Sequence, residues 1–356
     1  MEVKWYSVLV SLVGVILSFA DPITDILTLV EFYRADHKTW FGVGLVFVIL
    51  PCLFFPVPYC MNEDEEFKHY NRVRKCVQTL LCACHPFSAA LRRLEGFLFC
   101  LKQLMRGDEI DSHRRTVTED DIERNIFPYV SFESVLESAP QFVIQLYAVN
   151  VQEEPVTLVQ IISLPVSFLS LAWASTTFDV TLDLNINNGK AQRVKYKLAL
   201  FVTQVLLLSS RLFAICYFTV SYKWWVLVVL LLHVFVLLIT NTVWLCERDC
   251  DFTVPFIFIF LYCLNWLRDY VSVVIQNLLE DRGSKKELRR MQLVSNVLFV
   301  FENLVMIVSY YFDQHSKNWY SSPLTVCVLV LSVLAAVTRV TLFRFLYKDL
   351  DRRNCN

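Results

Sequence analysis

Residues 131–149 read SFESVLESAPQFVIQLYAV, a mostly apolar segment with a polar side chain at every fourth position. The four polar residues are Glu133, Glu137, Gln141 and Gln145. Side chains four residues apart lie on one face of an α-helix, so the segment predicts an apolar helix with a polar stripe. At about 1.5 Å per residue the stripe is about 18 Å long, more than half of the hydrocarbon thickness of a bilayer.

The composition of the whole chain places this helix in a membrane protein. Of the 356 residues, 56% are hydrophobic and 19% are charged, whereas soluble domains carry about 45–50% apolar and about 25% charged residues. The apolar excess falls in blocks of about 20 residues or more, which is the length of a transmembrane helix. We therefore expect an all-α polytopic membrane protein, since these blocks lack the alternation of a membrane β-barrel.

Eight blocks have the length of a membrane span, and two further stretches are partial. The eight lie near residues 5–32, 40–60, 128–149, 155–178, 196–221, 224–246, 293–313 and 321–347. Residues 76–104 and 252–279 mix apolar runs with charges, which indicates helices that enter the membrane partly or lie on its surface. The first block resembles a signal peptide, but the basic region before it is limited to Lys4 and its apolar pattern continues, so we expect a retained span.

The order of the elements predicts two parallel pseudo-repeats, each with two spans, a partial helix and two more spans. The predicted parts are a first helical repeat at 1–178, a cytosolic connector at 179–195, a second repeat at 196–347 and a short cytosolic tail at 348–356. Four crossings in each half return the chain to the same side. Basic residues are concentrated in one set of connections, so the positive-inside rule predicts cytoplasmic N- and C-termini.

Ionisable side chains also occur in other predicted spans. Asp21 and Asp25 repeat the four-residue spacing, and Arg211, Glu302 and Arg339 lie in later apolar blocks. Each such charge costs about 2.5–3.5 kcal/mol at the middle of a bilayer on insertion scales. Two interpretations remain open: the acids pair with the arginines and hold the helices together, or part of the polar row is a pathway for a charged or zwitterionic group.

The length of the stripe favours a lipid as the solute. A transporter site for a small solute normally uses interrupted, glycine-rich helices, and this chain has 7 glycines. A lipid headgroup could follow the polar stripe of a helix that otherwise faces lipid, while its tails stay in hydrocarbon. The pair Asp21-Pro22 also predicts either a break in the first helix or only a kink that the helix tolerates.

The cysteines and the net charge give no indication of a cofactor or a nucleic-acid partner. Most of the 12 cysteines lie in or beside apolar blocks, where a thiol acts as a small hydrophobe. Cys82, Cys84 and His85 resemble part of a metal site, but no second ligand pair follows at zinc-finger spacing. The net charge is −1. We therefore expect no metal, no cofactor and no nucleic acid.

Several motifs resemble the XK family, which includes the XK-related lipid scramblases. The segment ESAPQFVIQLY at 137–147 is similar to the family signature, and DPITD at 21–25 resembles its paired aspartates. SLAWA at 170–174, SSRL at 209–212 and EN at 302–303 resemble further family motifs in the same order. The resemblance covers residues 20 to 310. It implies eight membrane helices with two partial ones, and passive phospholipid scrambling that exposes phosphatidylserine on apoptotic cells for engulfment.

The resemblance also implies a plasma-membrane protein that makes and breaks no covalent bond, and is therefore not an enzyme. Its predicted lipid pathway combines the family's charged positions with the stripe: Asp21, Asp25, Glu133, Glu137, Gln141, Gln145, Arg211 and Glu302. Some relatives are activated by caspases, and a tetrapeptide ending at Asp111 has the acidic character of such a site. Expected partners are phospholipids, a caspase and a second membrane protein.

Two alternatives accompany this interpretation. Some relatives do not scramble lipids and act as partners of other membrane proteins, which predicts a scaffold whose buried charges only stabilise the fold. The third hypothesis is a secondary transporter for a small polar solute.

Overall fold

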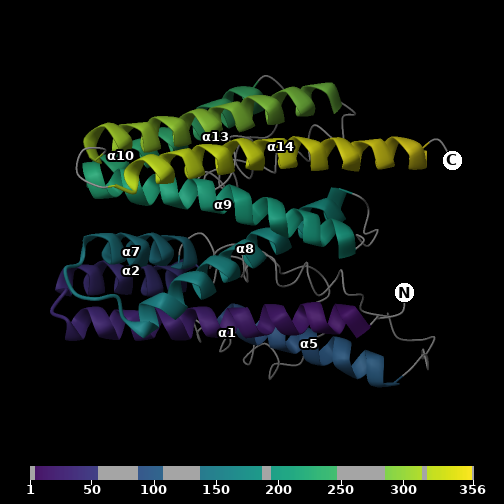
Figure 1. Ribbon diagram of the computed structural model, residues 1–356. Helices are drawn as coiled ribbons and strands as arrows, with labels where there is room; N and C mark the ends of the chain where they lie inside the picture. The colour runs from purple at the N-terminus through teal and green to yellow at the C-terminus, as the bar shows by residue number, and fades with distance from the viewer. Residues whose placement is uncertain are drawn as a thin grey trace. The chain divides into compact units, whose positions relative to one another are not determined.

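The computed structural model describes residues 5–54, 87–106, 137–186, 194–246, 285–314 and 319–354. Its elements in these ranges are helices, and no strand occurs among them (Figure 1). Five of the described helices are long and apolar enough to cross a membrane, and two shorter apolar helices lie at Lys38–Ile49 and Trp225–Val236. The predicted all-α polytopic membrane class is confirmed, while the number of eight crossings stays a prediction.

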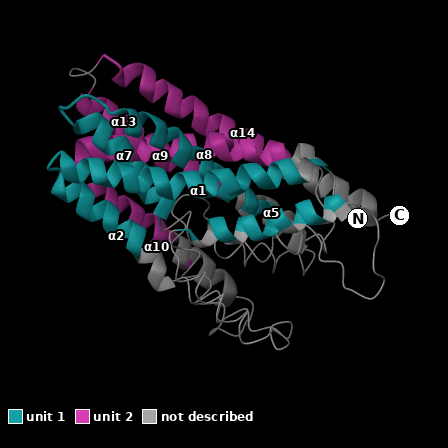
Figure 2. Ribbon diagram, turned by 90° about the horizontal axis from the view of Figure 1, so that it is seen from below, with its two compact units in different colours: residues 1–192 teal, residues 193–356 magenta. Residues whose placement is uncertain are grey.

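The chain divides into two compact units, residues 1–192 and 193–356 (Figure 2). The described helices of unit 1 are α1 (Trp5–Arg34), α2 (Lys38–Phe54), α5 (Ser88–Arg106), α7 (Ala139–Val151) and α8 (Leu158–Ile186). In this unit α1 packs against α2, α5 and α8, and α7 packs against α2 and α8. The polar stripe of α7 thus has protein neighbours on two sides.

Unit 2 contains the helices α9 (Val194–Tyr222), α10 (Trp225–Cys246), α13 (Lys285–Gln314) and α14 (Ser321–Asn354). The three helices α9, α13 and α14 pack against one another, and α10 packs against α9. In both units the first long helix packs against the last one, α1 against α8 and α9 against α14. The predicted repeat and its boundaries remain predictions, but the two units share this contact.

Each of the eight predicted spans overlaps a described helix. Helix α5 overlaps the predicted partial helix at 76–104, whereas the other one at 252–279 lies outside the described residues. Helices α8, α13 and α14 extend beyond their apolar blocks by up to eight residues, α13 beginning at Lys285 rather than 293. The extensions of α13 and α14 contain lysine and arginine, which are good helix formers, so these helices can continue where the apolar block ends.

The predicted break in the first helix is wrong. Helix α1 continues from Trp5 to Arg34 with Pro22 in its interior. Proline removes one backbone donor, but neighbouring helices and hydroxyl side chains make such a loss tolerable inside a membrane. Two threonine hydroxyls donate hydrogen bonds to backbone carbonyls one turn earlier in α1. Thr24 Oγ1 donates to the Asp21 carbonyl at 3.0 Å, and Thr28 Oγ1 donates to the Thr24 carbonyl at 2.9 Å.

The first two helices of each unit are joined by a short turn with one left-handed residue. These residues are Asp36 with a φ of 63° and Lys223 with a φ of 48°. A left-handed residue is a common way to end an α-helix, because it lets backbone N–H groups reach the last carbonyls. In unit 1 the His37 N–H donates to the Phe32 carbonyl at 2.9 Å, and in unit 2 the Lys223 N–H donates to the Thr219 carbonyl at 2.8 Å.

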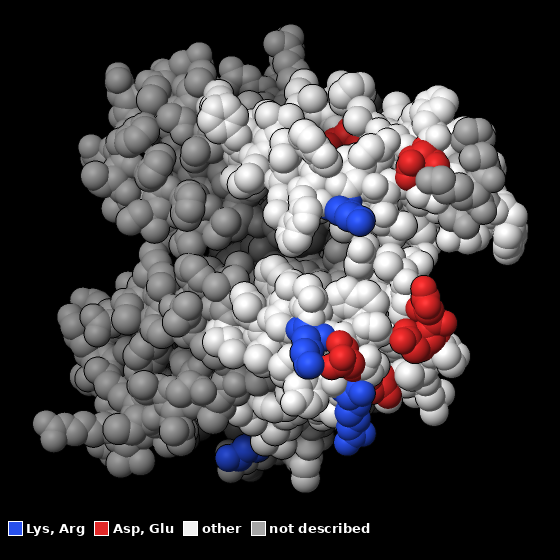
Figure 3. Space-filling view, turned by 90° about the vertical axis from the view of Figure 1, so that its left-hand side faces the viewer, with Lys and Arg blue, Asp and Glu red and all other residues white. Residues whose placement is uncertain are grey.

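The outer surface of the described helices is strongly apolar, as a lipid-facing surface must be. On α10 the side chains of Leu231, Leu232 and Phe235 are exposed, and on α13 those of Val297 and Phe301. An exposed apolar surface of this kind would be unusual on a soluble monomer. Figure 3 shows instead the helix ends on the left-hand side of Figure 1, among them the α1–α2 turn, and here the charged side chains of the described residues gather in small groups.

Helices α1, α2 and α7 approach closely at Gly44. A Cβ atom at this position would overlap Leu29 Cδ2 and lie 3.3 Å from Gln141 Oε1. Leu29 has little room to move, because it is 4% exposed and packs with Phe32 and Ala148. The small residue at position 44 therefore sets how closely these three helices pack.

This contact predicts that Gly44→Ala destabilises unit 1 despite the better helix propensity of alanine. We expect a loss of about 1–3 kcal/mol, the usual cost of overfilling a packed core. Unfolding of the purified protein in detergent measures it. Gly42→Ala is the matched control, because a Cβ there meets no heavy atom within 4 Å. Equal stability of the two variants would contradict the close contact.

Candidate functional site

The polar stripe of α7 faces the interior of unit 1. The side chains of Glu137, Gln141 and Gln145 are only 1–2% exposed, as are those of Asp21 and Asp25 on α1. We refer to these five residues as the unit 1 polar row. The expectation that α7 otherwise faces lipid is wrong, because Ala139, Pro140, Phe142, Leu146 and Ala148 are buried as well. Helices α2 and α8 cover α7 on either side.

Hydrogen bonds from α7, its N-cap and α8 meet at the two aspartates of α1. Ser138 Oγ donates to Asp21 Oδ2 at 2.9 Å. Asp25 Oδ1 accepts two hydrogen bonds, from Gln145 Nε2 at 2.8 Å and from Ser167 Oγ at 2.9 Å. Since Asp25 lies on α1, Gln145 on α7 and Ser167 on α8, this carboxyl group joins all three helices.

Two further residues of the polar row, Gln145 and Gln141, also form hydrogen bonds within unit 1. Ser163 Oγ on α8 donates to Gln145 Oε1 at 2.8 Å. Gln141 Nε2 donates to the backbone carbonyl of Gly44 on α2 at 2.6 Å. Sequence analysis did not identify Ser138, Ser163 or Ser167. The four-residue spacing of the last two on one apolar helix was the available signal, because it places them on one face.

The connection between α7 and α8 is held by polar contacts at one end of the row. Thr157 Oγ1 donates to Glu31 Oε2 on α1, and His37 Nε2 lies 3.3 Å from Glu154 Oε2. The pKa of the exposed Glu154 is below its ordinary value, mainly through a hydrogen bond within its own residue and also through His37. These contacts tie the α7–α8 connection to α1 and to the α1–α2 turn.

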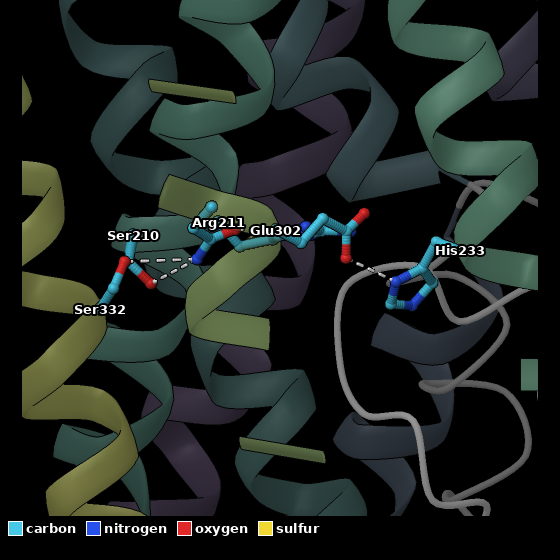
Figure 4. Close-up of polar contacts among 6 residues, drawn as sticks. Ser210, Arg211, His233, Glu302 and Ser332 are labelled. Carbon is cyan, nitrogen blue, oxygen red and sulfur yellow. Dashed lines mark hydrogen bonds and ion pairs between the residues drawn. The ribbon is translucent and has the colours of Figure 1, made fainter. Parts of the chain in front are cut away.

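Unit 2 has a different polar centre, which is an ion pair. Arg211 on α9 is completely buried, and its Nη2 donates to Glu302 Oε1 on α13 at 3.1 Å. The other oxygen, Glu302 Oε2, lies 2.8 Å from His233 Nδ1 on α10 (Figure 4). Arg211 and Glu302 thus form an ion pair between α9 and α13, as the first of the two interpretations predicts for these two residues. His233 was missed, since one histidine in an apolar block gives no periodic signal.

Asn303 extends this centre to the fourth helix of unit 2. Arg211 Nη1 donates to Asn303 Oδ1 at 3.2 Å. Asn303 Nδ2 in turn lies 3.4 Å from the hydroxyls of Ser210 on α9 and Ser332 on α14. The Arg211 guanidinium also lies over the Phe299 ring, 5.7 Å from its centroid. The charged group therefore has hydrogen-bonding partners and an aromatic neighbour in the core.

The two units thus stabilise buried charge in different ways. Within the described residues, the hydrogen-bond donors to Asp21 and Asp25 are hydroxyl and amide groups. In unit 2 a guanidinium group faces a carboxylate. Bonds to an opposite charge are roughly twice as strong as those between neutral groups. The aspartates of unit 1 therefore retain more capacity to bind a new partner than the carboxylate of unit 2.

Some predicted positions are not described. Glu133, Asp111, Cys82, Cys84 and His85 lie outside the described residues. Among the residues that the structure describes, no group of three His, Cys, Asp or Glu side chains is placed to hold a metal ion.

Comparison with known protein families adds the identity of the chain. A family model described as XK-related protein matches residues 9–348. The chain belongs to the XK-related family. The match includes both polar centres, so the unit 1 polar row and the Arg211–Glu302 pair lie in the part of the chain that this XK-related protein shares with its family.

The buried ion pair predicts an asymmetric response to substitution. Glu302→Leu leaves the Arg211 charge uncompensated in the core, and we expect a loss of about 3–5 kcal/mol in unfolding free energy. The double variant Arg211→Met/Glu302→Leu removes both charges and should lose clearly less. Denaturation in detergent measures both.

The control for this prediction is Lys38→Ala, which removes an exposed ion pair with Asp36 whose side chains are 74% and 81% exposed. Exposed pairs contribute about 0–1 kcal/mol. A double variant less stable than Glu302→Leu would contradict the view that the pair's charges are the main constraint at this centre.

Proposed function

We propose that this XK-related protein is a plasma-membrane phospholipid scramblase that exposes phosphatidylserine during apoptosis. It moves lipids passively between leaflets, makes no covalent bond, and has both termini in the cytoplasm. Membership of the XK-related family supports this class of function. The observation that carries the proposal is the unit 1 polar row, a continuous set of carboxyl, amide and hydroxyl groups inside a helix bundle with an apolar outer surface.

The chemistry of the polar row suits a phospholipid headgroup. A zwitterionic or serine headgroup carries an ammonium, which carboxylates bind, and phosphate oxygens, which hydroxyl and amide donors bind. The groups now bonded to Asp21 and Asp25 are neutral, and a hydrogen bond from a neutral donor to a carboxylate contributes about 1.5–3 kcal/mol net. A headgroup could therefore exchange with them, one at a time, as it moves along the row.

The row is closed in this structure, since its five side chains are at most 2% exposed. Scrambling thus requires a second conformation in which α1, α7 and α8 separate enough to admit a headgroup. Such an inactive resting state fits a protein that is switched on by a signal. Cleavage after Asp111 by a caspase is the switch that we propose.

Within the predicted pathway, the residues fall into two classes. Asp21, Asp25 and Glu137 belong to the unit 1 polar row, and we assign the headgroup route to them. Arg211 and Glu302 bind each other in unit 2, so they exchange partners less readily. We assign them a stabilising role.

A second candidate function is that of a non-scrambling partner for another membrane protein. The closed row favours it, because buried polar groups that stay bonded to one another act only as structural contacts. Purified protein that is folded, inert toward lipids and isolated with a second membrane protein would support this candidate.

The route predicts that Asp25→Asn and Glu137→Gln slow lipid scrambling at least about tenfold, the effect of losing about 1.4 kcal/mol of headgroup interaction in the rate-limiting step. These substitutions keep the size of each side chain and remove its charge. Scrambling is measured in liposomes containing fluorescent phosphatidylserine, as the fraction of label that an external reductant can reach, with and without caspase.

Ser332→Ala provides the control, because Ser332 is fully buried in unit 2 and outside the row. We expect it to scramble like the parent protein. Parent-like rates in Asp25→Asn and Glu137→Gln would exclude the unit 1 polar row as the route. A parent protein that stays inert in every condition would favour the partner function.

A further inference from the structure

His233 is a buried titratable group that the proposed lipid route does not use. It is the one basic residue in α10, whose sequence WVLVVLLLHVFVLLITNTVWLC is otherwise apolar around it. The side chain is 2% exposed, although α10 carries exposed apolar residues such as Leu231 and Phe235 on another side. The histidine therefore points from a peripheral helix into the core of unit 2.

The contact that His233 makes there connects α10 to two other helices. Its Nδ1 lies 2.8 Å from Glu302 Oε2 on α13, while Glu302 Oε1 accepts a hydrogen bond from Arg211 on α9 at 3.1 Å (Figure 4). An ionised carboxylate only accepts hydrogen bonds, so Nδ1 carries the hydrogen. One carboxylate thus links the three helices.

The charge on the histidine affects this contact. The charged and titratable groups that face it are Glu302 from α13 and Arg211 from α9. A neutral imidazole donates to Glu302 and adds no charge to the buried pair. A protonated imidazole is attracted to Glu302 but repelled by Arg211, and it adds a net positive charge to the buried pair. The desolvation cost of burying this charge is larger than the attraction to Glu302. Protonation therefore favours conformations in which His233 reaches water.

We propose that His233 and Glu302 form a proton-sensitive latch, which holds α10 against α9 and α13 at neutral pH and releases it on acidification. The ligand of this site is a proton, and the imidazole of His233 binds it. Opening becomes progressively more favourable as the pH falls below about 6.5, the ordinary pKa of an accessible histidine, because the histidine is protonated in the open conformation. Helix α10 is suited to such movement because its exposed apolar residues can remain in lipid while the helix shifts.

Hydrogen exchange of the full chain in lipid nanodiscs tests the latch. The exchange rates of peptides from residues 225–246 are compared at about pH 7.5 and about pH 5.5, which lie on either side of the ordinary pKa of histidine. The rates are first corrected for the effect of pH on amide exchange in an unstructured chain. In the parent protein we expect at least about tenfold faster exchange at the lower pH, because the charge-assisted contact to Glu302 is lost. Peptides from α1 should not change.

Two variants separate protonation from packing. His233→Asn keeps a neutral N–H donor that cannot be protonated, so the amides of α10 should exchange slowly at both pH values. His233→Phe removes the donor, so α10 should exchange fast at both. His37→Asn is the matched control, since it removes a histidine that contacts Glu154 in unit 1, and it should keep the parent response.

An equal pH response in the parent and in His233→Asn would overturn the proposal, as would a parent without any response. If His233→Phe does not fold, the comparison of the parent with His233→Asn still shows whether the pH response of α10 depends on protonation of His233. The measurement needs no lipid transport, so its failure is distinguishable from failure of the scramblase proposal.

Discussion

The two hydrogen bonds that Asp25 accepts from Gln145 and Ser167 are the interaction on which unit 1 depends. A carboxyl group in a membrane helix has no water to bind, so it must be satisfied by protein. Here the donors come from α7 and α8, while the acceptor lies on α1. The requirement to bury one polar group therefore decides which helices pack together. It also explains why α7, although apolar enough to face lipid, lies inside the bundle.

Unit 2 meets the same requirement with opposite charges. Arg211 and Glu302 neutralise each other, and Asn303 connects the pair to α14 through Ser332. Removing one member of such a pair leaves a buried charge, so the arrangement is hard to open by small steps. In unit 1 the aspartates are bonded to neutral groups, and each bond is weaker. The contrast suits a protein in which one polar centre opens and the other keeps the helices in place.

Family membership and this contrast together give the proposed mechanism its physical basis. A lipid headgroup cannot enter a row whose side chains are at most 2% exposed, so transport and closure belong to different conformations. Neutral donors make the hydrogen bonds to the aspartates easier to exchange, whereas the close packing of α1, α2 and α7 at Gly44 adds to the cost of opening. In the second centre, the His233 contact gives α10 a response to protonation that does not involve the lipid route.

The sequence alone determined the helical membrane class, the approximate position of each described span and the positions of the polar residues, because hydrophobic block length and four-residue spacing are local properties. The XK-type motifs also indicated the family. Only the tertiary structure decided what the stripe faces, since periodicity shows which side chains share a face but not which helix covers it. The serines on α8, the neutral partners of Asp25 and the contact of His233 with Glu302 all depend on residues far apart in the chain. The tertiary structure also decided that α1 continues through Pro22, because neighbouring helices determine whether a membrane helix tolerates proline.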